Sequence, residues 1–282
     1  MSNRSRQSQQ DVRGKRVLIT GASGTIGRAL GARLVAQGAL VVGLDLHPIG
    51  DEPHPVITCD ITDDAGVVTA VAEAIERLGG GLDVLVNNAG IGGPAPAELP
   101  PGEEVRRQLD INLVGTWRVT AACVDALVAN RGRVVMVASR MAVLQLPLAA
   151  AYGASKRAMV AYADALRHEL GTHVGVTCVY PSAVRSPIHD STAAAGLSLE
   201  GMSTYEPLEG VVDAIVRAAL STRVRRDVTT TRKGAIEFFI ARHLPAVSDR
   251  IVRRTLAERA RAGAFDAADL AAGVVRRHRE LA

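Results

Sequence analysis

The sequence predicts an α/β protein: one Rossmann-type, doubly wound parallel sheet in a single domain, followed by a helical C-terminal extension. Short runs rich in Val, Leu and Ile alternate along the chain with longer stretches of helical pattern. Most of these runs are continuously apolar, which is typical of parallel strands buried on both faces. A glycine-rich turn joins the first run to the first helical stretch. Strands that alternate with helices imply right-handed βαβ units, and 282 residues suffice for one such domain with its core.

The individual elements follow from these patterns. The apolar runs predict strands at residues 16–20, 39–45, 56–59, 82–86, 133–138, 174–179 and 226–231. The stretches between them predict helices at residues 26–37, 63–78, 103–130, 150–170 and 208–220. Gly38 is expected to end the first helix, because glycine adopts the left-handed conformation common at helix C-termini. Residues 181–206 show neither the spacing of apolar residues typical of a helix nor the apolar run typical of a strand, so they are expected to be irregular.

Composition divides the chain into three parts. Residues 1–13 are polar and predict a flexible arm. Residues 14–233 are expected to form the Rossmann-fold domain that holds any functional site, and residues 234–282 a basic extension of helices broken near Pro245 and Gly263.

The apolar content excludes several classes of protein. No apolar segment near the first residue predicts a signal peptide, and no run of about 18 apolar residues predicts a membrane span. Cys59, Cys123 and Cys178 lie far apart in apolar stretches, so we expect three core residues without a metal site or a disulfide. This cysteine usage predicts a cytoplasmic location.

A candidate phosphate-binding turn, Thr20-Gly21-Ala22-Ser23-Gly24-Thr25-Ile26-Gly27, links the first strand to the first helix. Glycines let the backbone approach a pyrophosphate closely, and the helix N-terminus offers free N–H groups. The turn therefore predicts a dinucleotide site. Asp45 ends the second strand and favours NAD, because its carboxylate accepts hydrogen bonds from the ribose hydroxyls and repels the 2′-phosphate of NADP. NADP is the alternative cofactor.

Together with several further motifs in the same order, this turn resembles the short-chain dehydrogenase/reductase family over about residues 13–231. Gly21 and Gly27 match the family's glycine motif, although Thr25 replaces its middle glycine and Gly24 lies one place earlier. The resemblance implies an NAD(P)-dependent oxidoreductase acting on CH–OH groups. It also implies a homodimer or homotetramer formed through the two long helices.

The same resemblance assigns the site residues. Asn87-Asn88-Ala89-Gly90 and Tyr152-Gly153-Ala154-Ser155-Lys156 match the family's motifs, and the segment from Pro181 to Ser186 is similar to the one that holds the nicotinamide amide. The implied cofactor-binding residues are Gly21, Ser23, Gly24, Thr25, Ile26, Gly27, Asp45, Asp60, Ile61, Asn88, Ala89, Gly90, Tyr152, Lys156, Pro181, Val184 and Ser186. The implied catalytic residues are Asn112, Ser139, Tyr152 and Lys156.

Tyr152 and Lys156 suit acid–base chemistry because residues four apart share one face of a helix. A free tyrosine has a pKa of about 10. A cationic Lys156 and the positive nicotinamide ring together are expected to lower it to about 7, which needs ~4 kcal/mol of differential stabilisation. Ser139, just past a strand, is expected to hold the substrate oxygen near Tyr152. By resemblance, Asn112 kinks the helix 103–130 and orders a water that connects Lys156 with solvent, and Lys156 binds the nicotinamide ribose.

Three segments are expected to line the substrate pocket: residues 92–98, 140–148 and 187–205, the last as a mobile lid. Their largely apolar composition favours a hydrophobic alcohol or ketone, such as a steroid, a retinoid or a lipid derivative. Arg185 or His189 would contradict this prediction if either pointed into the pocket.

The net charge of +4 is unevenly placed, because residues 223–282 hold 14 Lys/Arg and 7 Asp/Glu. Apolar residues recur at helical spacing among these arginines. They are Phe238, Phe239, Ile240, Leu244, Ile251, Val252 and Leu256. Packing on the body or on a partner subunit is the favoured interpretation, contact with a membrane surface is the second, and nucleic acid is the least favoured.

Two other functional classes stay open for this fold. A nucleotide sensor or scaffold keeps the cofactor site without chemistry, and the complete set of catalytic residues argues against it. An epimerase or dehydratase is suggested by the Gly-x-x-Gly-x-x-Gly spacing, and the short substrate region argues against it.

Overall fold

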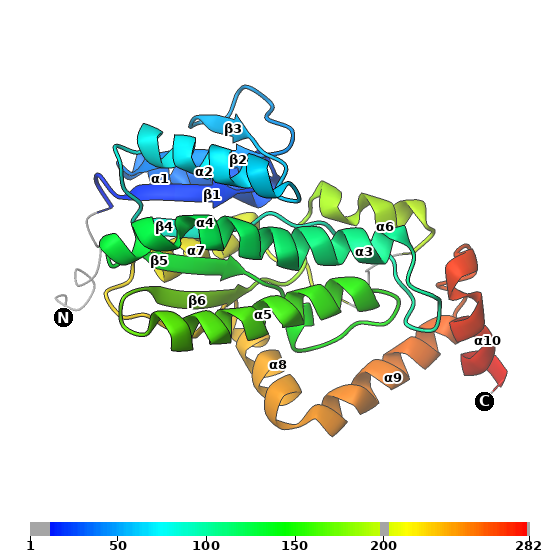
Figure 1. Ribbon diagram of the computed structural model, residues 1–282. Coiled ribbons are helices and arrows are strands. Elements are labelled where there is room, and N and C mark those ends of the chain that lie inside the picture. Colours follow the sequence, from blue (N-terminus) through cyan, green and yellow to red (C-terminus); the bar gives the residue numbers. More distant parts are fainter. Residues whose placement is uncertain (1–11, 198–202, 281–282) are drawn as a thin grey trace.

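A seven-stranded, entirely parallel sheet forms the centre of the molecule (Figure 1). The structure, a computed structural model, describes residues 12–197 and 203–280. The strand order is β3-β2-β1-β4-β5-β6-β7, so the chain winds outward first to one side of β1 and then to the other. The strands are β1 (Arg16–Thr20), β2 (Leu40–Asp45), β3 (Val56–Thr58), β4 (Val84–Asn87), β5 (Arg133–Val137), β6 (Gly175–Tyr180) and β7 (Asp227–Thr229). The predicted doubly wound fold is confirmed.

Helices cover both faces of the sheet. The main ones are α1 (Thr25–Ala36), α2 (Asp64–Arg77), α3 (Glu103–Leu109), α4 (Thr116–Ala129), α5 (Ala150–Leu170) and α7 (Leu208–Leu220). Helices α2, α4 and α5 pack on one face, and α1 and α7 pack together on the other. Short helical turns fall at η1 (Asp110–Gly115), η2 (Arg140–Ala142), η3 (Pro187–His189), α6 (Asp190–Ala194) and η4 (Asp269–Ala271). The extension consists of α8 (Arg232–His243), α9 (Pro245–Arg261) and α10 (Ala272–Glu280).

Alternate residues of each central strand enter opposite cores, which explains the continuous apolar runs. Leu18 of β1 faces the core under α2, α4 and α5, whereas Val17 and Ile19 face the core under α1 and α7. Burial of each such side chain stabilises the fold by roughly 1.5–3 kcal/mol. The three cysteines are buried, as predicted. The edge strands β3 and β7 are shorter than expected, because each pairs with a single neighbour.

The long helix expected at residues 103–130 is interrupted by a π-helical segment, Asp110–Gly115. Contrary to the sequence expectation, the helix 103–129 is long and apolar enough to cross a membrane, with a mean hydropathy of 1.3. No other helix among the described residues is long and apolar enough. This helix instead covers the sheet: Val119, Cys123 and Leu127 are fully buried in the core.

Residues 181–206 are more regular than predicted. Pro187 begins a 3-10 turn that leads into α6, because its ring fixes a helical φ at the first position of a turn. Leu199 and Met202, expected in the lid, lie outside the described residues, as does the predicted arm up to residue 11.

The extension packs on the body through a third, separate core. Phe238 meets Tyr180 edge to face, with ring centroids 4.7 Å apart. Further along, α9 and α10 share a cluster with two residues of the expected substrate segments. The cluster consists of Leu148, Leu197, Leu256, Ala260, Phe265, Ala268, Ala271 and Val275. Phe239, Leu244 and Ile251 stay exposed, so contact with a partner subunit or a membrane stays a prediction.

Candidate active site

The carboxyl ends of β1 and β4 meet where the strand order reverses, and a hydrogen-bonded junction joins them. Thr20 Oγ1 accepts hydrogen bonds from the backbone N–H groups of Asn88 and Ala89, both at 3.0 Å. The Asn88 amide donates to the Gly21 carbonyl at 3.0 Å. Gly21 has a φ of +64°, and a Cβ there would lie 2.8 Å from Ala89 Cα. Only glycine fits at this position, since the two strand ends approach so closely.

The turn before α1 fits a pyrophosphate. A Cβ at Gly27 would lie 2.1 Å from the Gly21 carbonyl oxygen, so this glycine closes the turn. A Cβ at Gly24 would meet that oxygen alone, at 3.4 Å, so the outer side of the turn is open. No side chain caps α1 and no acidic residue lies in its first turn. The N–H groups of Thr25 and Ile26 are therefore available to an anion.

Carboxylates follow β2 and β3 at the same edge of the sheet as this turn. Asp45 accepts hydrogen bonds from the backbone of Ser23 at 2.9 Å and of His47 at 3.0 Å. Asp60 accepts hydrogen bonds from the backbone N–H of Thr62 at 2.8 Å and from its hydroxyl at 2.7 Å. Both hydrogen bonds lower the pKa of Asp60. Ile61 is buried: a Cβ on Gly115 would lie 2.7 Å from its side chain, which therefore packs on the helix rather than facing the turn.

Lys156 is buried at the centre of the site. Its Nζ donates a hydrogen bond to the Val137 carbonyl at 3.0 Å and lies 5.9 Å from the centroid of the Tyr152 ring. A Cβ on Gly90 would lie 3.2 Å from this amine, so the Asn-Asn-Ala-Gly loop packs against it. Burial lowers the pKa of Lys156 to about 8.

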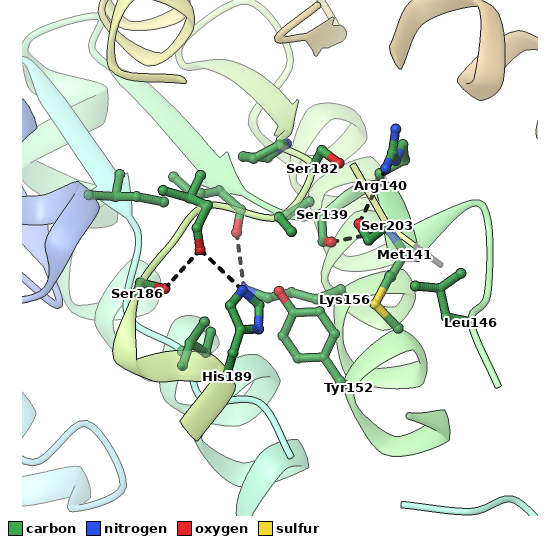
Figure 2. A pocket seen from close by; sticks show the side chains of 18 of the residues that line it. Ser139, Arg140, Met141, Leu146, Tyr152, Lys156, Ser182, Ser186, His189 and Ser203 are labelled. Carbon is green, nitrogen blue, oxygen red and sulfur yellow. Dashed lines mark hydrogen bonds between the residues drawn. The ribbon is translucent and has the colours of Figure 1, made fainter. Parts of the chain in front are cut away.

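Tyr152 stands beside Lys156 and Ser139 in the same pocket (Figure 2). Burial raises the pKa of its phenol, and a hydrogen bond with Ser139 lowers it by less. Desolvation thus outweighs the hydrogen bond from Ser139. The lower pKa expected beside Lys156 and the positive nicotinamide ring stays a prediction. Ser139 Oγ also accepts a hydrogen bond from Met141 N at 3.1 Å.

Asn112 lies within the π-helical segment and is fully buried. Its Oδ1 accepts from Ile91 N at 2.8 Å, and its Nδ2 donates to Ile91 O and to Ser155 Oγ, both at 2.9 Å. Asn112 thus ties the loop after β4 to α5, the helix that carries Tyr152 and Lys156. The interruption that the resemblance implied for this helix is present.

Whereas Asn112 is buried behind them, Ser139, Tyr152 and Lys156 line one pocket with a largely apolar wall. Its lining residues are Ile26, Asn88, Gly90, Val137, Ala138, Ser139, Arg140, Met141, Leu144, Leu146, Tyr152, Lys156, Pro181, Ser182, Ala183, Val184, Ser186, Ile188, His189 and Ser203. The structure thus places Pro181, Val184 and Ser186 beside the catalytic candidates.

The sequence places Arg140 in a segment expected to line the pocket, but it does not predict the ion pair that this buried cation forms. Arg140, which follows Ser139 directly, forms an ion pair with Glu237 of α8. His189 also lines the pocket, with Nε2 3.1 Å from the Val184 carbonyl, and burial lowers its pKa. This placement meets the condition expected to contradict a hydrophobic substrate, so His189 counts against a wholly apolar one. Arg185 instead stacks on Tyr205, with 5.0 Å from its guanidinium carbon to the ring centroid. No spacing in the sequence joins residues 140 and 237, so only the fold reveals this pair.

Comparison with known proteins gives consistent matches. A family model described as short chain dehydrogenase matches residues 15–195. Momilactone A synthase of Oryza sativa subsp. japonica is 32% identical over 73% of this chain and 82% of its own length. L-fucose dehydrogenase of Mus musculus is 32% identical over 64% of this chain and 70% of its own length.

Solved structures agree with these matches. A 3-ketoacyl-(acyl-carrier-protein) reductase from Brucella melitensis, complexed with NADH, matches with a TM-score of 0.67 and 29% identity, over 78% of this chain and 99% of that one. A short chain dehydrogenase from Burkholderia cenocepacia J2315, in complex with NADP, matches with a TM-score of 0.72 and 24% identity, over 86% of this chain and 99% of that one.

Proposed function

Because this chain belongs to the short-chain dehydrogenase family and is an NAD(P)-linked oxidoreductase, we propose that it interconverts a secondary alcohol and a ketone with Tyr152 as the general acid/base. The observation that carries the proposal is the meeting of Ser139, Tyr152 and Lys156 in one pocket, next to Ile26 and Gly90 of the two cofactor loops.

When bound, the nicotinamide supplies or accepts the hydride, and the protein handles the proton. Ser139 donates a hydrogen bond to the substrate oxygen and holds it beside Tyr152. In reduction the Tyr152 hydroxyl gives its proton to that oxygen, and in oxidation the phenolate removes it. Lys156, in its cationic form, stabilises the phenolate electrostatically, and the low-dielectric surroundings strengthen this interaction. Asn112 holds the helix and loop that set this geometry.

NAD is the proposed cofactor. Asp45 ends β2 beside Ser23 of the glycine turn, where its carboxylate is positioned for ribose hydroxyls. A 2′-phosphate at the same place would meet like charge.

The proposed substrate is a hydrophobic alcohol or ketone with one polar group. Met141, Leu144 and Leu146 supply an apolar wall that favours a steroid, retinoid or lipid-like body. Arg140 and His189 stand in the same pocket and offer hydrogen bonds to a second oxygen of the substrate.

A substrate panel tests this proposal. Each substrate is assayed with both cofactors, and the absorbance of the reduced nicotinamide measures turnover. We expect steroids or long-chain secondary alcohols to react faster than sugars or 2-hydroxy acids, and a preference for the polar set would refute the hydrophobic substrate. Tyr152→Phe is expected to lose at least about 10²-fold in kcat while still binding cofactor. Tyr162→Phe, on the same helix but in the core against Trp117, is the matched control. If the protein is instead a nucleotide sensor, Tyr152→Phe should leave its function unchanged.

A further inference from the structure

The loop between β2 and β3, residues 46–55, places a second carboxylate at the glycine turn. Glu52 accepts a hydrogen bond from the Ser23 hydroxyl, and the backbone N–H groups of Ile49 and Gly50 donate to the same carboxylate at 2.7 and 2.8 Å. Three donors from two segments fix its position, which makes Glu52 part of a built corner rather than a free surface group.

Ser23 connects this carboxylate to the proposed ribose site. Its backbone N–H donates to Asp45 at 2.9 Å, and its hydroxyl donates to Glu52. Both carboxylates therefore approach one residue of the cofactor turn. The Ser23 hydroxyl, next to the carboxylate proposed to bind the ribose, is a candidate donor to a 2′-phosphate, and Glu52 already accepts its hydrogen bond.

The neighbouring cation is also neutralised. Arg28, in the first turn of α1, is the arginine closest in sequence to the glycine turn, and it forms an ion pair with Asp51 at 3.0 Å. A phosphate beside the ribose would need such a cation or a free hydroxyl. The loop 46–55 withdraws both, through Asp51 and Glu52 respectively.

We propose that Glu52, held by Ser23, is a cofactor-specificity residue that excludes the 2′-phosphate of NADP alongside Asp45. The inference rests on the proposed function, since it assumes that the ribose of a dinucleotide lies beside Asp45. The hydrogen bonds from Ser23, Ile49 and Gly50 hold the pKa of Glu52 at about 2, so the group is ionised at every working pH. Its charge acts on the phosphate and not on the uncharged hydroxyls of NAD.

The test measures binding to the full chain directly. NADH or NADPH is titrated with the protein, and the fluorescence of the reduced nicotinamide reports the bound fraction. Glu52→Gln keeps an acceptor for the Ser23 hydroxyl while it removes the charge. We expect the Kd for NADPH to fall at least tenfold and the Kd for NADH to change less than twofold. The gain for NADPH should shrink as salt is raised, since exposed charges are screened. Glu169→Gln, the same substitution in the last turn of α5, is the control for net charge and should change neither Kd.

Two results would overturn the proposal. One is an unchanged ratio of the two Kd values in Glu52→Gln with a melting temperature equal to that of the wild type. The other is an equal gain for NADPH in Glu169→Gln, which would make the effect one of net charge. In either case turnover of the wild type with NAD would leave the proposed function standing. Failure of the wild type to bind either cofactor would overturn both.

Discussion

Lys156 offers a quantitative test of how the active site is buried. The lysine is 3% exposed, and its surroundings lower its pKa from 10.5 in the unfolded chain to about 8 in the folded one. Between these values the unfolded state binds more protons than the folded state, so the free energy of unfolding rises with pH across this window. Below about pH 8 both states are protonated, and the folded state carries the full cost of the buried charge. That cost is about 3 kcal/mol.

Lys156→Met removes the titrating group and keeps most of the side chain. The variant should therefore be more stable than the wild type at pH 8, and its advantage should fall by about 2 kcal/mol between pH 8 and pH 10. Urea titrations followed by circular dichroism at the two pH values measure this difference. Other titrating groups are common to both proteins and cancel. Lys15→Met, at an exposed lysine before β1, gives the matched control. A difference between wild type and Lys156→Met that is flat, or that moves in the opposite direction, would refute burial as the dominant influence on Lys156.

Three further substitutions test separate parts of the site. Glu237→Gln leaves the buried Arg140 without its carboxylate. We expect the free energy of unfolding to fall by about 2 kcal/mol and the KM for substrate to rise. A fall below about 0.5 kcal/mol would contradict a stabilising ion pair. Gly24→Ala and Gly210→Ala both accept a Cβ without a close contact, but only the first should weaken NADH binding, by about tenfold or more in a fluorescence titration. Equal affinities would exclude Gly24 from the phosphate site. Asn112→Ala removes the two hydrogen bonds to the partly buried Ile91 and the one to Ser155. The variant should lose about 3 kcal/mol of unfolding free energy in a urea titration, and a nearly neutral effect would count against the clamp.

The parts of the fold set by local pattern could be predicted from the sequence. The helix Ala150–Leu170 was predicted with its observed bounds, because a long helical pattern ends there at a glycine of positive φ, Gly171. The central strands were predicted because both of their faces are buried and their residues are uniformly apolar. The interruption at Asp110–Gly115 was expected from the resemblance alone, since no local signal in the helical pattern marks it.

The contacts that join distant segments could not be predicted. Arg140 begins a segment that the sequence predicts to line the pocket, but only the position of α8 brings Glu237 to it. Glu52 lies in a short polar loop without periodicity, and the backbone path of that loop decides that it meets Ser23. The raised pKa of Tyr152 follows from the depth of the pocket, which is a property of several elements together.

The extension contacts the segments that carry part of the pocket lining. Leu148 and Leu197, which belong to the expected substrate segments, are buried in the same cluster as Leu256 and Phe265 of the extension. Arg277 of α10 forms an ion pair with Glu98 of another expected substrate segment. Buried apolar contacts transmit displacement because close-packed cores have little free volume. Leu148 and Leu197 do not line the pocket themselves, but their segments carry lining residues such as Leu146 and His189. Movement of α9 and α10 is therefore expected to displace these segments, while the glycine turn, which rests on the central sheet, keeps its place. Cofactor binding and substrate selection thus depend on different cores, and changes within residues 232–280 should alter the KM for substrate before they alter the Kd for cofactor.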